Sequence, residues 1–450
     1  MLQTVEDVSP KKKGGLHYAF IICVGGFLTQ FIVLSAQRLP AISLESIRET
    51  LGVTYAEVGL ITSIYMVFYA GLSFAWGIAA DKFGTRKMIV AACGLAAVGA
   101  ISFGLLAPLG LIPAIVTWSI AGCGTAGLLM AILPKIVSRW FAPHKRGMGM
   151  SLITPGANFS AIILGIIAPI IIASTGWEMA YIIFGGIYAL IALFIAFTFR
   201  EGPEEKGIAP YGAPEGTQAA PEPTIQKSAA KTGAPAESAI KRVLKMPITW
   251  HFGVFYIIYQ IGYMAATQFY VASIQSAGFD LAQASLAITW GGILTIITEL
   301  ILGQLSDRME RKNLMAFMVA LNAILSLAYF FYLSSVAAPS LLVCYFFVAT
   351  VSACTGVITV IMTAAGEYYE DDIRATGTGV VGTINIVGRY LGPWIAGLAI
   401  DATGFVGNSF LIVGITMAIA AVIAFAMPRK RNKKGVPVAE SAANLEGAAL

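Results

Sequence analysis

Charged residues and cysteines are both scarce in this sequence. Of its 450 residues, 12% are Asp, Glu, Lys or Arg, whereas 57% are hydrophobic. Soluble domains carry about 25% charged residues, so the composition excludes an ordinary soluble protein and indicates a polytopic membrane protein. The five cysteines all fall inside apolar runs, without metal-ligand spacing or extracellular pairing, which argues against a zinc site and against a disulfide framework.

Signatures of catalysis are missing as well. The three histidines, His17, His144 and His251, lie at the ends of apolar runs, and no stretch has the pattern of a phosphate-binding loop or of a nucleophile with its base. We therefore expect neither an enzyme nor a cofactor. The net charge of +5 arises from basic residues in the turns between apolar runs, so it does not indicate a nucleic-acid partner.

What the sequence does have is a series of long apolar runs. We count twelve that are long enough to cross a bilayer, which takes ~20 residues, and therefore expect an all-α membrane protein with twelve transmembrane helices. The segment after the sixth run is rich in Pro, Ala, Gly, Glu and Lys, as is typical of a flexible linker. The predicted organisation is a tail (1–16), a six-helix bundle (17–199), a linker (200–247), a second six-helix bundle (248–427) and a second tail (428–450).

Lysine and arginine are unevenly distributed among the connecting segments. Lys11–Lys13, the Asp81–Lys87 turn, Arg374 and the Arg429–Lys434 tail fall on one side of the predicted membrane, whereas Arg48 is the clear exception on the other. Cytoplasmic loops of membrane proteins carry such an excess of basic residues. We therefore expect both termini in the cytoplasm, with the basic turns in contact with membrane lipids.

A short polar motif is repeated between the apolar runs. The stretch Gly77–Lys87 joins the second and third runs, and a related stretch with Asp307 and Arg308 begins 226 residues later at Gly303. A second pair of matching turns, one starting at Arg146 and the other at Arg374, is 228 residues apart. The repeat indicates that the chain consists of two related halves.

The first copy of this motif reads G-x-x-x-D-[RK]-x-G-x-[RK]-[RK] and resembles the signature of the major facilitator superfamily. The resemblance implies two six-helix bundles with a substrate site at the midplane between them, in a transporter that works as a monomer. The motif itself has the character of a gate, in which Asp81 is expected to cap the start of the eleventh span and to pair with Arg139 or Arg146. The predicted gating residues are Gly77, Asp81, Lys82, Gly84, Arg86, Arg146, Asp307 and Arg308.

Ionisable side chains inside a span are the first candidates for function, because an unpaired one costs roughly 2.5–3.5 kcal/mol on insertion scales. Arg38 lies in the outer part of the first span, just before Pro40, which we expect to interrupt that helix, and Gln30 belongs to a polar edge that runs toward it. A guanidinium binds a carboxylate at two points, so Arg38 is a candidate anchor for a substrate carboxylate. The alternative is an arginine at the membrane surface that pairs with Glu45.

Three further ionisable residues are candidates. Arg389, with Asn385 on the same face of the eleventh span, is a candidate second anion contact from the other bundle, the alternative being a pairing between the bundles at the gate. Glu299 in the eighth span would exchange a proton during transport or, as the alternative, form a structural ion pair with a residue such as Arg308. Lys135 in the fourth span would meet the anion, or would simply anchor its helix to lipid phosphates or to Asp81.

Polar stripes on other spans predict a cavity lined with water. They fall on the second, fifth, seventh and tenth spans, which the resemblance implies are cavity-lining helices. Hydrogen bonds between packed helices are an equally good explanation for each residue alone. The candidate substrate-binding residues on these stripes are Tyr69, Asn158, Tyr259, Gln260 and Tyr263.

Further stretches are similar to particular branches of the superfamily. Leu51–Ser63 and Trp140–Gly147 resemble bacterial organic-acid carriers of the anion:cation symporter kind, and Arg374–Gly377 with Gly388–Pro393 is similar to aromatic-acid:proton and related metabolite symporters. We therefore expect a secondary active transporter of the bacterial inner membrane that moves a small organic anion, a mono- or dicarboxylate, by alternating access. A proton or a counter-anion is the expected coupling partner.

Three alternatives remain open at this point. The protein would be an anion exchanger, an exporter of neutral or cationic solutes in which both arginines are structural, or a transporter-like sensor that signals through the segment Glu201–Met246. Deleting that segment would separate the last alternative from the others, because a carrier would keep transporting whereas a sensor would lose its output.

Overall fold

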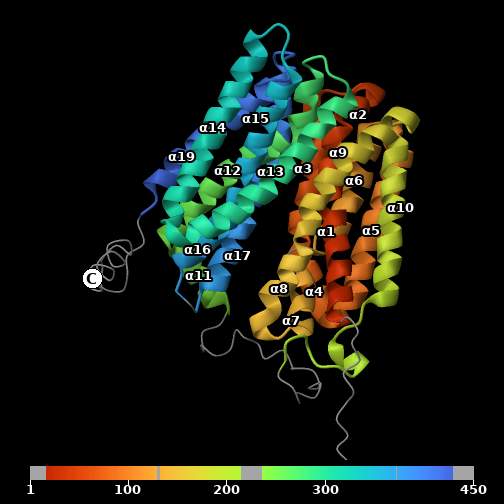
Figure 1. Ribbon diagram of the computed structural model, residues 1–450, viewed down its shortest axis with the longest axis vertical. Helices are drawn as coiled ribbons and strands as arrows, with labels where there is room; N and C mark the ends of the chain where they lie inside the picture. The colour runs from red at the N-terminus through yellow and green to blue at the C-terminus, as the bar shows by residue number, and fades with distance from the viewer. Residues whose placement is uncertain (1–16, 129–131, 214–235, 371, 429–450) are drawn as a thin grey trace, which may run out of the picture.

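The computed structural model describes residues 17–128, 132–213, 236–370 and 372–428, and these residues are almost entirely helical. The helices form two side-by-side bundles that meet along the centre of the molecule (Figure 1). Within the described residues, eight helical segments could each cross a membrane by length and apolar composition alone. Most of the remaining spans are broken into two shorter helices, which explains why they do not qualify singly.

The N-terminal bundle contains six spans. A short helix at one end, α2 (Leu44–Leu51), follows the first span. The spans are, in order, α1 (Ala19–Ile42), α3 with α4 (Tyr55–Gly71 and Ser73–Phe83), α5 (Thr85–Leu106), α6 with α7 (Leu111–Thr125 and Leu133–Trp140), α8 with α9 (Arg146–Ile153 and Pro155–Thr175) and α10 (Trp177–Thr198).

The C-terminal bundle repeats this arrangement. It follows a short helix, α11 (Ala236–Lys245), which precedes the seventh span. The spans are α12 (Pro247–Gln275), α13 (Leu281–Arg308), α14 (Arg311–Ser335), α15 with α16 (Leu341–Cys354 and Ile358–Glu367, joined by the 3-10 turn η5, Thr355–Val357), α17 with α18 (Arg374–Ile384 and Ile386–Asp401) and α19 (Asn408–Ala426).

The internal repeat is visible in the way corresponding helices pack. Gly156 of α9 lies against the Phe27 carbonyl and the Gln30 side chain of α1, so closely that a Cβ would stand 2.2 Å from the carbonyl oxygen. In the C-terminal bundle, Gly388 of α18 lies against the Ile257 carbonyl and the Gln260 side chain of α12, again with 2.2 Å for a Cβ. The first and fifth spans of each bundle therefore share one packing contact, which confirms the predicted duplication.

Pro40 does not interrupt the first span, contrary to the expectation from sequence. The helix α1 includes Pro40 and continues to Ile42, and the Ser43 N–H bonds back to the Leu39 carbonyl. A proline removes one donor and disturbs one carbonyl a turn earlier. Because Pro40 falls in the last turn, few intrahelical bonds depend on it and the helix extends past it.

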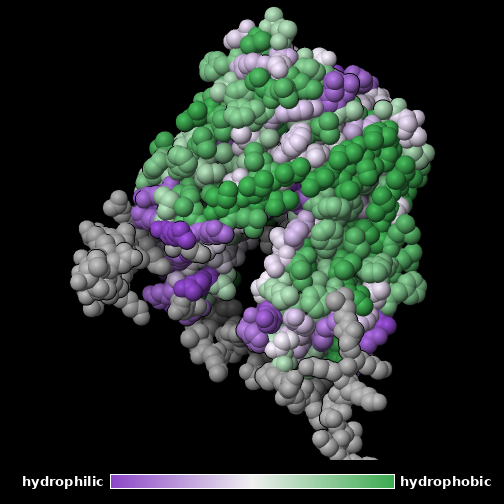
Figure 2. All heavy atoms as spheres, viewed as in Figure 1, coloured by the Kyte–Doolittle hydropathy of each residue, from purple (hydrophilic) through white to green (hydrophobic). Residues whose placement is uncertain are grey.

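The two ends of the molecule differ. We call the end that carries Gly84, Arg139 and Lys312 the linker end, and the end that carries α2 and Asp401 the far end. At the far end the bundles are in contact, with α3 packed on α18 and α9 packed on α13. On the face seen in Figure 2, a broad apolar band crosses both bundles, polar groups lie at the linker end, and the bundles are separated by an opening there.

At the far end, one carboxylate joins the bundles. The Asp401 oxygens at the end of α18 accept the Tyr55 and Ala56 N–H groups at the start of α3, at 2.9 and 2.8 Å. Thr54 accepts the next N–H, that of Glu57. The first N–H groups of a helix have no intrahelical acceptor, so Asp401 completes the cap of a helix that belongs to the other bundle.

Part of the predicted linker is ordered against the bundles. Residues 199–213 lie under the N-terminal bundle, where they include the 3-10 turn η4 (Pro203–Lys206) and where the Tyr211 N–H donates to the Trp140 carbonyl at 2.9 Å. On the C-terminal side, Arg242 of α11 pairs with Glu370 and Asp372. The structure therefore differs from a linker that is flexible throughout 200–247, because both of its ends carry side chains that satisfy charges on the bundles.

Candidate central cavity

The main cavity lies between the bundles and encloses about 160 Å³. It is lined by α1, α9, α12 and α13 and by the breaks in the fifth and tenth spans, at Thr154 and η5. Its lining combines Arg38, Glu299 and Asn158 with tyrosines and hydroxyl residues.

Arg38 is held by the N-terminal bundle at only one of its nitrogens. Its Nη1 donates to the Ala157 carbonyl at 2.6 Å and to the Ser160 hydroxyl at 2.8 Å, both on α9. Glu45, the alternative partner suggested by sequence, pairs instead with Arg48 at 2.9 Å and accepts the Tyr55 hydroxyl. Within the described residues the Nε and Nη2 groups of Arg38 make no hydrogen bond, so they can bind an anion while Nη1 fixes the orientation of the guanidinium.

Glu299 lines the same cavity from the opposite bundle. Its Oε2 accepts a hydrogen bond from the Asn158 amide of α9 at 3.4 Å, and both residues line the cavity together with Arg38. Arg308, the partner suggested as an alternative, is exposed at the end of α13. Glu299 and Asn158 therefore form a polar contact between the bundles within the cavity.

A smaller cavity adjoins the first on the side of Arg38. It shares Arg38, Tyr263 and Thr267 with the main cavity, and it is also lined by Gln268 and Trp118. Gln268 Nε2 and Trp118 Nε1 are buried and have no hydrogen-bond partner within the described residues. Both atoms are donors, so two unsatisfied hydrogen-bond donors line the cavity that also contains Arg38.

Arg389 lies apart from both cavities. It sits on α18 and is half-buried, and it makes no hydrogen bond or ion pair within the described residues. Tyr69 of α3 and Tyr256 of α12 are close enough to interact with it electrostatically. Its guanidinium is therefore placed between the bundles without a protein carboxylate to neutralise it.

The remaining predicted binding residues are buried in helix contacts to different degrees. Tyr263 lines both cavities, whereas the Tyr259 hydroxyl donates to the Thr355 carbonyl at 3.3 Å. Asn385, at the break between α17 and α18, donates to the Gly382 carbonyl at 2.8 Å. Tyr69 stacks on Tyr65 with ring centroids 6.2 Å apart. These residues hold the helices that shape the site, and of them only Tyr263 faces a cavity.

Gln30 and Gln260 occupy equivalent positions in the two bundles. Both are buried, and each lies against the glycine of the fifth span described above, Gly156 for Gln30 and Gly388 for Gln260. Gln30 Oε1 and both polar atoms of the Gln260 amide lack hydrogen-bond partners within the described residues. Neither residue lines the two cavities, so their amides belong to the packing between first and fifth spans.

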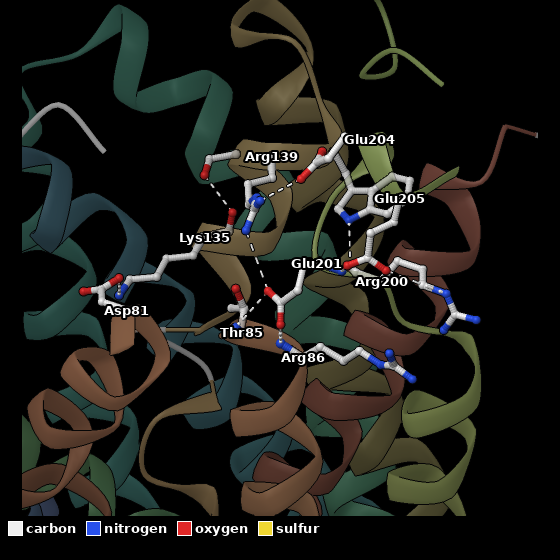
Figure 3. A network of polar contacts seen from close by, with 11 residues as sticks. Asp81, Thr85, Arg86, Lys135, Arg139, Arg200, Glu201, Glu204 and Glu205 are labelled. Atoms are coloured by element: carbon white, nitrogen blue, oxygen red, sulfur yellow. Dashed lines mark hydrogen bonds and ion pairs between the residues drawn. The ribbon is translucent and has the colours of Figure 1, made fainter. Parts of the chain in front are cut away.

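Lys135 is bound at the linker end rather than in the cavity. Its Nζ donates to the Asp81 carboxylate at 2.6 Å (Figure 3). It also donates to the Gly77 carbonyl at 2.8 Å. Asp81 thus pairs with Lys135, whereas Arg139 bonds Glu204 at 2.7 Å and the side chain of Arg146 donates to a carbonyl of α7. The structure therefore places Lys135 in the contact with Asp81 that sequence offered as the alternative to substrate binding.

The other motif residues organise the linker end of the N-terminal bundle. The Glu201 carboxylate accepts the Thr85 and Arg86 N–H groups at 3.0 and 2.8 Å and so caps α5 (Figure 3). It occupies the space where a Cβ of Gly84 would be, and Gly84 has a φ of +93°, a conformation that side chains oppose. The Arg86 guanidinium donates to the Ala196 carbonyl, and Lys82 lies over the Phe83 ring. The predicted role of the Asp307 side chain falls outside what the structure describes, and Arg308 is exposed.

Several residues of the site were not singled out from sequence. Tyr270 and Gln268 line the cavities, and Tyr270 follows Tyr263 by seven residues on α12, so the helical period places them on one face. Ser160 and Asp401 gave no such signal. Their roles depend on contacts with α1 and α3, segments that are remote in the sequence.

Comparisons with known proteins agree with this architecture. A family model described as Major Facilitator Superfamily matches residues 26–359 and 275–447. A probable sulfoacetate transporter of Cupriavidus necator is 23% identical over 84% of this chain and 86% of its own length. A membrane sensor protein of Escherichia coli is 22% identical over 82% of each chain.

The fold matches solved transporter structures as well. A bacterial homologue of the human lysosomal transporter Spinster, solved in an inward-facing and unoccupied conformation, superposes with a TM-score of 0.72 over 92% of this chain and 97% of that chain, at 16% sequence identity. Together, the family match along the chain, the two six-helix bundles and the cavity between them show that this multi-pass membrane protein belongs to the major facilitator superfamily.

Proposed function

We propose that this protein is a secondary active transporter that moves a small organic anion across the bacterial inner membrane. The observation that carries the proposal is Arg38, a guanidinium in the central cavity with its Nη1 fixed and its Nε and Nη2 free of protein partners. A charge inside the membrane is costly unless it is paired or lines water. Glu299 acts on this charge from across the same cavity, and a solute with a carboxylate or an equivalent anionic group would supply the hydrogen-bond acceptors for Nε and Nη2.

Arg389 would provide a second cationic contact from the C-terminal bundle. It interacts electrostatically with Tyr69 and Tyr256, and no carboxylate in the described part of the chain pairs with it. An anion that moves from Arg38 toward the linker end would come under its influence. The likeness to a probable sulfoacetate transporter supports an organic anion as the substrate.

Alternating access would follow from rocking the two bundles around the cavity. The contacts that now close the far end would then break while the opening at the linker end closes. The basic residues at the linker end favour a cytoplasmic location for that end and for both termini. Glu299 is the proposed site of proton exchange, because it lies in the cavity beside Asn158 and opposite Arg38. A single chain contains the complete cavity, so the protein would work as a monomer.

Ligand-induced thermal stabilisation of the purified full chain tests this function. A ligand at 100 times its Kd stabilises by about 2.7 kcal/mol. We expect organic acids, and not neutral sugars or cationic compounds, to raise the melting temperature of the wild type, and the shift to be lost in Arg38→Gln and reduced in Arg389→Gln. Arg48→Gln, which removes an arginine outside the cavities, is the matched control. Equal shifts with neutral or cationic compounds in all four proteins would refute the proposal.

A sensor is the second candidate function, favoured by the likeness to a membrane sensor protein. The cavity would then bind the anion, and the signal would pass through the linker end rather than lead to transport. Reconstitution in proteoliposomes separates the two functions, because a carrier accumulates or exchanges a radiolabelled acid. A chain that binds the acid without moving it would favour the sensor.

A further inference from the structure

The helix α11 lies at the linker end, outside the spans (Figure 1). The first turn of α12 fixes its last turn. The Thr249 hydroxyl donates to the Val243 carbonyl at 2.7 Å, and the Trp250 indole N–H donates to the Leu244 carbonyl at 2.9 Å. The last carbonyls of a helix have no intrahelical donor, so α12 supplies donors and holds α11 at the point where the seventh span begins.

The side of α12 next to α11 faces the hydrocarbon. Tyr263 of α12 lines the main cavity, and Val254 is nine residues away, so at about 100° per residue it lies on the opposite side of the helix. Gly253 contacts α17 and Gly262 contacts α19, so helices of the same bundle flank this side. Val254 and Trp250, one turn apart, are 46% and 52% exposed. Exposed apolar side chains on this side of a span meet lipid, and tryptophan is typical of the boundary between membrane and water.

Two sides of α11 are bound to the C-terminal bundle. Val243 is completely buried. Arg242 pairs with Glu370 and Asp372, which precede α17, at 2.5 and 2.8 Å. The charge of Arg242 is therefore already neutralised by carboxylates of the protein, and it fastens α11 to the turn before α17.

The outward sides of α11 carry an apolar pair, Ile240 and Leu244, and a basic pair, Lys241 and Lys245. The members of each pair are four residues apart and share one side of the helix. Each lysine directly follows a member of the apolar pair, so the basic pair lies about 100° further around the helix, away from the buried Val243. All four side chains are exposed. Apolar and basic sides next to each other are typical of a helix that lies among lipid head groups.

We infer that α11 binds anionic phospholipid in the leaflet at the linker end. The apolar pair extends the lipid-facing surface of Trp250 and Val254 to the level of the head groups, and the basic pair meets the phosphates. Basic side chains are attracted to an anionic leaflet, so two of them favour a lipid with a net negative charge over a zwitterionic one. Because Arg242 joins α11 to the turn before α17, bound lipid also holds this turn at the membrane surface.

Lipid titrations of the purified full chain in a neutral detergent test the binding. Phosphatidylglycerol and phosphatidylcholine with the same acyl chains differ only in the head group. We expect phosphatidylglycerol to raise the melting temperature at concentrations at least about fivefold lower than phosphatidylcholine does. In Lys241→Gln/Lys245→Gln, the apparent affinity for phosphatidylglycerol should fall about tenfold, and that for phosphatidylcholine should change by less than about twofold.

The matched control is Lys145→Gln/Lys206→Gln, which removes two lysines at the linker end outside α11. It should keep the affinity for phosphatidylglycerol within about twofold of the wild type. An equal loss in both double variants would mean that the lipid responds only to net charge. That result, an unchanged affinity in Lys241→Gln/Lys245→Gln, or equal affinities of the wild type for the two lipids would overturn the inference. The anion proposed for the cavity is tested separately, by the thermal shifts with organic acids.

Spin labels on the full chain in lipid nanodiscs test the apolar side. A label at residue 240 should be more accessible to oxygen, which dissolves in lipid, than to a water-soluble nickel chelate. A label at residue 144, in the turn η3 (Pro143–Lys145), should show the reverse. If the label at residue 240 behaves as the one at residue 144 does, this side of α11 faces water and suits a soluble protein, and the inference is wrong.

Discussion

Two carboxylates in this molecule perform the same task at opposite ends, but only one of them joins the bundles. Asp401 accepts the first two N–H groups of α3 at the far end, and Glu201 accepts the first two N–H groups of α5 at the linker end. Asp401 and α3 belong to different bundles, whereas Glu201 belongs to the linker residues that pack on the same bundle as α5. Capping by Asp401 therefore stabilises the conformation in which the far end is closed, whereas capping by Glu201 stabilises the N-terminal bundle itself.

Two ion pairs in the described part of the linker end also stay within a bundle. Lys135 pairs with Asp81, and Arg311 pairs with Glu367. These pairs keep their partners when one bundle rocks against the other. At the far end, by contrast, separation of the bundles breaks the two hydrogen bonds between the N–H groups of α3 and the Asp401 carboxylate. The comparison teaches that the end at which polar groups cross the interface is the end that stays closed.

The largest effect is expected from a side chain placed in the far-end contact. A Cβ on Gly397 would lie 2.6 Å from the Ala56 Cα and 2.6 Å from the Tyr55 carbonyl oxygen, so Gly397→Leu should prevent closure of the far end and reduce transport to less than a tenth. Spin labels at residues 49 and 402 should report a longer distance than in the wild type. Gly94→Leu, at a glycine with open space around it, is the control. An unchanged label distance in Gly397→Leu would contradict the prediction.

Removal of the cross-bundle cap should have a smaller effect on the same equilibrium. Loss of an N-terminal cap costs about 1 kcal/mol, so Asp401→Ala should shift the ratio of far-end-closed to far-end-open molecules roughly fivefold toward the open form. The same pair of labels measures the shift. If the ratio stays constant, Asp401 is not what holds this end closed.

Removal of the matching cap within a bundle should lower stability without changing that ratio. Glu201→Ala removes two hydrogen bonds to the start of α5 and the carboxylate that pairs with Arg139. The free energy of unfolding should therefore fall by about 1 kcal/mol. Thermal melts together with the label distances check both parts. A change in the label distances would contradict this prediction, because Glu201 would then affect closure of the far end as Asp401 does.

The smallest effect is expected at the solvent-exposed pair of Asp81 and Lys135. The Asp81 and Lys135 side chains are 51% and 35% exposed, and exposed ion pairs contribute only about 0–1 kcal/mol. Asp81→Asn should therefore change the stability of the present conformation by less than about 1 kcal/mol, as measured by chemical denaturation. A larger loss would show that the motif already stabilises this conformation.

Much of the fold could be predicted because membrane helices are defined by local composition. Apolar runs, basic turns and the repeated motif at Gly77 and Gly303 indicated two six-helix bundles before any contact was known. The site was predicted less completely. Arg38, Glu299, Asn158 and Tyr263 line the main cavity, whereas Lys135 pairs with Asp81 and Gln260 is buried outside it. Helical spacing identifies a polar face, but not whether that face meets water or another helix.

By itself, the sequence determined that this chain spans a membrane with twelve helices in two related halves, because continuous apolar runs of ~20 residues satisfy their backbone polar groups in hydrocarbon as helices and the motifs recur at a fixed interval. The tertiary structure alone decided which partner each of these charged side chains has. One nitrogen of Arg38 is bonded to α9, Lys135 pairs with Asp81, and Asp401 caps α3 of the other bundle. Such choices depend on contacts between residues far apart in the chain, and only packing of the two bundles brings those residues together.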